Sequence, residues 1–75
     1  MPPRMIKVVF KDTFPQHLVD GVWQAGDFLG LGSVYRQDDP RVLYIRPLPD
    51  SYLVLKDQLE SMEKEGALTF VEQSA

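Results

Sequence analysis

The chain has 75 residues, a length that fits one domain and that buries only about 60% of its unfolded surface on folding. It has no cysteine, which excludes disulfides and thiolate metal sites. Its net charge of -3 opposes binding to nucleic acid through the phosphates, and its 44% hydrophobic content favours a folded core over disorder. A core this small needs either tight packing or a partner for its stability.

No apolar run approaches the ~20 residues that a bilayer crossing requires. The first five residues precede a short strand-like run and not the apolar region of a signal peptide. The sequence therefore predicts a cytoplasmic protein without membrane association, folded as one domain over residues 1–75. We expect residues 1–4 to form a loose tail and residues 73–75 to be frayed.

The first elements expected along the chain are a strand and a helix. Residues 5–11 alternate between apolar and polar, which predicts a strand. Thr13 and Gln16 have the spacing of a capping box, and Pro15 suits the first turn of the helix that follows. We expect this helix to end near Gly26.

The expected first helix has an apolar stripe that should enter the core. The stripe consists of Leu18, Val19, Val22 and Trp23. We interpret Trp23 as a core residue, and Gly21 as a position that lets the helix lie close to the sheet.

The middle of the chain predicts a β-hairpin. Residues 42–46 are β-branched and aromatic, with Pro40 before them and Pro47 after them, which is typical of a strand paired on both sides. Residues 33–37 predict a weaker strand. The turn residues at 38–40 join the two strands.

The last part of the chain predicts a second helix and a fourth strand. The helix is expected to begin at Asp50 or Ser51 and to end at Gly66, which suits a left-handed residue after the helix. Residues 68–71 alternate again and predict a strand. The apolar stripe of the helix consists of Tyr52, Leu55, Leu59 and Met62.

The order β-α-β-β-α-β predicts an α+β, ferredoxin-like sandwich, in which a four-stranded antiparallel sheet carries both helices on one face. The first and third strands should be central, and we expect them to run parallel to each other. The covered face is assigned Ile6, Val8, Phe10, Val34, Leu43, Ile45, Leu68 and Phe70. The open face is assigned Lys7, Val9, Lys11, Tyr35, Val42, Tyr44, Arg46, Thr69 and Val71.

The open face is too apolar for a surface that only meets water, which is typical of a contact surface. The sequence predicts that its residues, Thr69 excepted, pack on a second copy of the chain or on another protein domain. An RNA-binding alternative uses Tyr35 and Tyr44 to stack on bases and the cations to meet phosphates, but the first strand offers no aromatic residue there.

The sequence predicts no cofactor, no metal site and no catalytic residue. His17 is the only histidine, and with Asp20 it is the one pair that suits the alternative of a small dimeric enzyme with a site between subunits. Asp38 and Asp39 are typical of a turn. The glycines at 26, 30 and 32 follow a helix, whereas a phosphate-binding loop precedes one.

The element order, the strand-to-helix turn from Asp12 to Pro15 and the second amphipathic helix resemble the ACT-type small-molecule-sensing domains and uncharacterised bacterial domains of the same topology. The turn of the family reads Asp-x-Pro-Gly, whereas this chain has one extra residue and Gln16 in place of the glycine. The resemblance implies pairing through sheets or strand edges, with an amino acid bound at the interface near Asp12, Thr13 and Gln16. The expected function is thus a non-catalytic association or small-ligand-sensing module, homodimeric through the open face or a strand edge.

Overall fold

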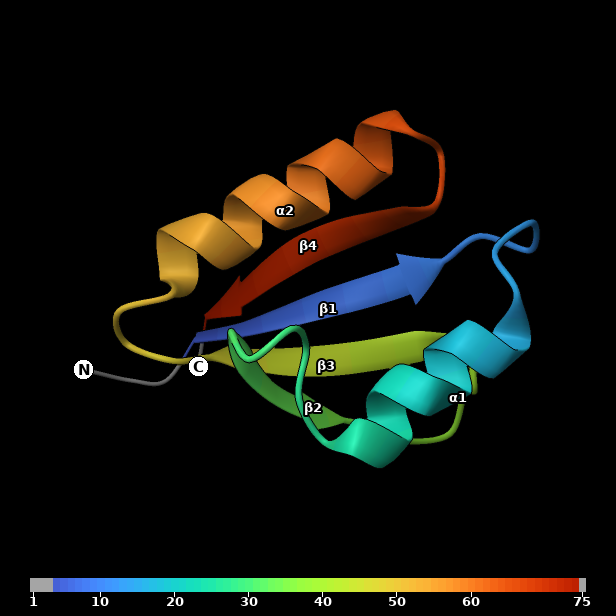
Figure 1. Cartoon of the computed structure of the whole chain (residues 1–75), viewed down its shortest axis with the longest axis horizontal. Helices are drawn as coiled ribbons and strands as arrows, with labels where there is room; N and C mark the ends of the chain where they lie inside the picture. Colours follow the sequence, from blue (N-terminus) through green and yellow to red (C-terminus); the bar gives the residue numbers. More distant parts are fainter. Residues whose placement is uncertain (1–3, 75) are drawn as a thin grey trace.

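The structure is a computed structural model that describes residues 4–74. Its elements are β1 (Arg4–Phe10), α1 (Gln16–Ala25), β2 (Gly32–Tyr35), β3 (Val42–Pro47), α2 (Tyr52–Lys64) and β4 (Leu68–Ser74). The strands form one antiparallel sheet, α1 packs against β2, and α2 packs against β4 (Figure 1). This α+β arrangement has the predicted element order and is compatible with a ferredoxin-like fold.

The sheet order is β2-β3-β1-β4, so β1 and β3 are central as predicted. The two strands nevertheless run antiparallel, with Ile6 opposite Ile45 and Val9 opposite Val42, and the expectation of a parallel pair is wrong. Each helix returns the chain to the end at which the preceding strand began, so the strands it joins are parallel. The hairpin between β2 and β3 then reverses the direction, which sets β3 against β1.

The strand ends differ slightly from the predicted ones. β1 ends at Phe10, so Lys11 follows the strand, and Arg4 belongs to β1 and not to a loose tail. β4 continues to Ser74, beyond the predicted 68–71 and into the segment expected to be frayed. Residues 1–3 and 75 of the predicted tail and frayed end lie outside the described residues.

Both helices end as predicted, and α2 also begins as predicted, with Ser51 at its N-cap. Gly26 (φ 78°) and Gly66 (φ 81°) adopt the left-handed conformation just after α1 and α2, as predicted. The capping box at the start of α1 is wrong, because the helix is capped by Pro15 without a side-chain bond. Ser51 is the N-cap of α2 but its hydroxyl makes no capping hydrogen bond either.

The core lies between the helices and the face of the sheet that was assigned to it. All eight residues of the predicted covered face are buried except Phe70, which is half-buried. Leu55 and Leu59 of α2 and Val19 of α1 complete one cluster with them, so both helices cover the same face.

Two interpretations of core residues are corrected by the structure. Trp23 is 44% exposed and lies under the guanidinium of Arg36, whose carbon is 4.7 Å from the ring centroid. The aromatic residue of this region that does enter the core is Phe28, which follows α1 and is 3% exposed. A Cβ added at Gly21 would meet nothing within 4 Å, so this glycine is not needed for close packing of α1.

Two glycine substitutions should have opposite effects on stability. A Cβ at Gly32 would lie 2.6 Å from the carbonyl oxygen of Arg46 and 2.9 Å from Cγ2 of Ile45, so Gly32→Ala should destabilise the fold by about 1–3 kcal/mol. Gly21→Ala lies in open space within α1 and should stabilise it by up to ~1 kcal/mol. Thermal unfolding of both variants tests the register of β2 on β3, and a neutral Gly32→Ala would contradict it.

Candidate association surface on the open face of the sheet

The side chains predicted for the open face form rows across the strands. The register places Tyr35 opposite Tyr44, Tyr44 opposite Lys7, and Lys7 opposite Val71, which is one row over all four strands. Residues directly opposite in a sheet point to the same face. This row therefore lies on the side away from the helices, since the alternate residues form the core.

A second row runs beside the first and is mainly apolar. Val42 is opposite Val9, and Val9 is opposite Thr69. Val9 is 37% exposed and Val71 of the first row is 62% exposed, so valine side chains from both central and edge strands reach the surface. The described elements include no third layer over this side (Figure 1).

The remaining predicted interface residues lie at the margins. Arg46 is opposite Ser33, and its guanidinium carbon is 5.6 Å from the ring centroid of Tyr35, close enough for a cation–π contact. Lys11 follows the end of β1, where its N–H donates to the carbonyl of Ala67 at 2.9 Å and its side chain is exposed. The structure thus brings seven of the eight predicted residues onto one face, with Lys11 just beyond it.

The open face also carries acidic groups that were not assigned to it. A shallow hollow of about 200 Å³ lies between Lys7, Val42 and Tyr44 of the sheet and the loop residues Gln37, Asp38 and Asp39. Lys7 makes no ion pair within the described residues, although both aspartates line the same hollow. Positive and negative charges therefore lie side by side on this face without neutralising each other directly.

The loop that supplies these carboxylates is held by hydrogen bonds from its own backbone N–H groups. The N–H of Arg41 donates to Oδ1 of Asp39 at 2.9 Å, and the N–H of Val42 donates to the carbonyl of the same residue. This confirms the predicted turn chemistry at residues 38–40. The position of the Asp39 side chain beside the sheet face is thus fixed by the turn.

The turn between β1 and α1, where the resemblance implies a ligand, is bound by the chain itself. The amide nitrogen of Gln16 donates to Asp20 and to the carbonyl of Pro40, both at 2.9 Å, and its oxygen accepts a hydrogen bond from Arg41. Asp12 is fully exposed and 4.0 Å from Nε of Arg41, and Thr13 is exposed. The polar atoms of Gln16 are therefore already engaged.

Arg41 is the residue of this turn that sequence reasoning missed. Its guanidinium also donates to the carbonyls of Phe10, Lys11 and Phe14, and its side chain is only 20% exposed. These contacts join the β2–β3 loop to a turn about 30 residues away in the sequence. No local pattern could indicate such a contact, because each partner is a backbone carbonyl or a distant side chain.

The one titratable pair considered for catalysis is not joined. Asp20 is bound by Gln16 and by Arg36, whose Nη2 lies 2.9 Å from its carboxylate, and His17 is exposed on α1. Within residues 4–74, no group of three or more His, Asp or Glu side chains could hold a metal ion. The arrangement of α1 is that of a surface helix with an ion pair.

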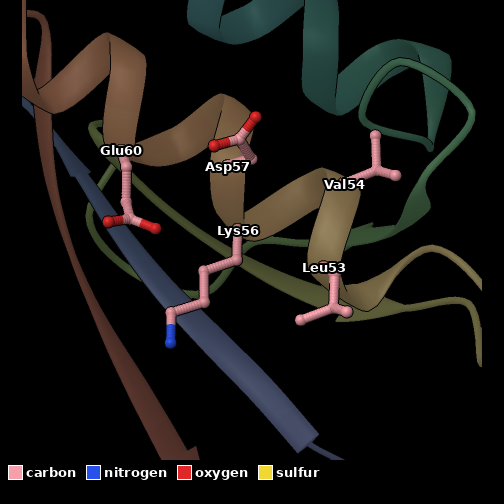
Figure 2. Close-up of a pocket in the computed structure, with 5 residues that line it drawn as sticks. All are labelled: Leu53, Val54, Lys56, Asp57 and Glu60. Carbon is pink, nitrogen blue, oxygen red and sulfur yellow. The ribbon is translucent and has the colours of Figure 1, made fainter.

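A second hollow, of about 470 Å³, follows the outer side of α2. Figure 2 shows the residues that line it, which are Leu53, Val54, Lys56, Asp57 and Glu60. Leu53 is 75% exposed, and the stripe is opposite the buried Leu55 and Leu59 of the same helix. This surface is thus separated from the open face of the sheet by the whole core, which makes it a suitable place for control substitutions.

Comparison with family models, with curated proteins and with solved structures gave no match to this chain. The longest helix in the described part of the chain is α2, with 13 residues, and neither helix has the length and apolar character that crossing a membrane demands.

Proposed function

We propose that the chain is a non-catalytic association module with a ferredoxin-like fold, and that it forms a homodimer through the open face of its sheet. The observation that carries this proposal is the continuous row of Tyr35, Tyr44, Lys7 and Val71 on a face that no described element covers. An exposed patch that contains tyrosine and valine side chains is typical of an interaction surface. Tyrosine is also enriched among the residues that contribute most of the binding energy at protein interfaces.

The charges of the face favour a second copy of the chain as the partner. In a two-fold interface each patch meets itself, so Lys7 of one copy can approach Asp38 and Asp39 of the other. By symmetry, each contact between Lys7 and these aspartates would then occur twice in the dimer. The same carboxylates would repel the phosphates of RNA, which reduces the support for an RNA-binding module.

The available area is sufficient for such a dimer. A stable interface buries about 800 Å² on each partner, which is roughly one sixth of the 4886 Å² surface of the chain. One broad side of a two-layer structure supplies this area. A small domain without disulfides would also gain stability from burying it.

A ligand-sensing site and an enzyme active site have less support than the association surface. A ligand site at the turn after β1 would need free polar groups, but the side-chain amide of Gln16 is bound to Asp20, Pro40 and Arg41. An enzyme with His17 and Asp20 would need these groups to act together, and Asp20 is instead paired with Arg36.

Light scattering combined with methyl NMR on dilution tests the proposal. We expect a mass of at least twice the 8.6 kDa chain in a concentrated sample, and signals of Val9 and Val42 that shift as the open-face contact dissociates. The methyl signals of Val54 on α2 should not move. A monomer at every concentration, or shifts confined to α2, would contradict the open-face dimer.

A further inference from the structure

The two edges of the sheet differ in whether the chain itself covers them. At the β2 edge, the N–H of Val34 donates to the carbonyl of Gly26 at 3.1 Å, and the N–H of Phe28 donates to the carbonyl of Gly32 at 2.9 Å. Asp27 and Ser33 form a β-bridge between these bonds. The segment after α1 thus occupies the outer side of β2 like a short additional strand.

β4 is the opposite edge, and its outward groups can be identified from the register. The N–H of Lys11 donates to the carbonyl of Ala67, one step beyond the pair of Phe10 and Leu68. Hydrogen-bonded and non-bonded pairs alternate along an antiparallel ladder, so Thr69 and Val71 bond to β1. The N–H and C=O groups of Leu68 and Phe70 therefore point to the outer side, where the backbone bonds of the described residues include none for them.

β4 also lacks the features that usually protect an edge strand. It pairs with β1 along all seven residues without a bulge, and it contains no proline and no lysine. Its only charged side chain is Glu72, whose carboxylate accepts a hydrogen bond from the Tyr52 hydroxyl at 2.7 Å and is thus drawn towards α2. A long, regular and nearly uncharged edge is a template for a further strand.

We propose that the outer edge of β4 pairs in the antiparallel direction with β4 of a second copy, about a two-fold axis at Val71. This register overlaps all seven residues of both strands. It places the outward Phe70 opposite Glu72 of the other copy, so the two carboxylates are not directly opposed. It also sets Val71 beside its own copy, which continues the open-face row of one chain into that of the next.

The edge contact is independent of the open-face dimer. Tyr44, near the middle of the open face, lies on β3, and β1 separates β3 from β4. One substitution can therefore disturb either surface without touching the other. If both contacts form, edge-paired sheets pack face to face into an assembly larger than a dimer.

Residue-resolved amide hydrogen exchange on the full chain, in a dilute and a concentrated sample, tests the proposal. The Phe70 amide should exchange at least about tenfold more slowly in the concentrated sample, whereas the Val71 amide, bonded to β1, should be protected in both. In Glu72→Pro, which removes an outward N–H and spares the ladder to β1, the protection of Phe70 should disappear. Glu72→Ala is the control for the lost carboxylate and should retain it.

The outcomes separate the two proposals. Fast exchange of Phe70 in a sample that is dimeric by light scattering would overturn the edge contact and leave the open-face dimer standing. Protection that appears only after an unrelated extended peptide is added would also overturn it, because the partner would not be a second copy. If Glu72→Pro fails to fold, the concentration dependence of the wild-type amide decides alone.

Discussion

Leu43→Ala is expected to leave a domain that unfolds at a temperature at least about 10 °C below that of the wild type. Leu43 is fully buried in the central strand β3 and lies opposite Val8, also fully buried. Its truncation removes apolar contacts and leaves a cavity, at a cost of about 2–5 kcal/mol. A chain of 75 residues has a total stability of only about 4–11 kcal/mol, so this loss is a large fraction of it.

Leu53→Ala is the matched control for this substitution. The same side chain is truncated, but Leu53 is 75% exposed on α2, and the free energy of unfolding should change by less than about 0.5 kcal/mol. Chemical denaturation of both variants gives the comparison. Equal effects of the two substitutions would mean that the covered face of the sheet has been assigned wrongly.

Tyr44→Glu is expected to dissociate the open-face dimer while preserving the fold. Tyr44 is half-buried between Tyr35 and Lys7 on the open face, and a carboxylate there would have to lose its water inside the interface. Loss of a central tyrosine typically costs about 2 kcal/mol or more of binding free energy, which raises the dissociation constant by at least roughly thirtyfold. Sedimentation equilibrium measures this constant directly.

Leu53→Glu serves as the control for charge and for general loss of apolar surface. It places the same carboxylate on the outer side of α2, away from the open face (Figure 2). Its dissociation constant should equal that of the wild type. If Leu53→Glu dissociated the dimer and Tyr44→Glu did not, the interface would lie on α2, and the open-face dimer would be contradicted.

The sequence was sufficient to predict the elements and the two faces of the sheet, because both depend on local spacing and on the residues that bound each element. Every second residue of a strand points to the same face, so strand geometry places Ile6 with Val8 and Leu43 with Ile45 on the face that forms the core. The open-face residues follow from the same rule. Their function as an interface stays a prediction, since alternation gives a surface but not its partner.

The features that the sequence could not predict all depend on contacts between distant segments. Trp23 has the spacing of a core residue, but the core beside α1 is completed by Phe28, and the tryptophan instead stacks on Arg36. Arg41 looks like a loop residue until its distant carbonyl partners are known. The acidic hollow also arises only when the β2–β3 loop is placed beside Lys7.

The most direct test of the open-face interface is the reactivity of Lys7 towards a small amine-specific reagent, with Lys56 as the internal reference. Both lysines are half-buried within one chain and have no ion pair in the described part, but Lys56 lies on the outer side of α2. In a concentrated sample that is mostly dimer, Lys7 should react about tenfold more slowly than Lys56, and the difference should vanish on dilution. Equal rates at high concentration would contradict a covered open face.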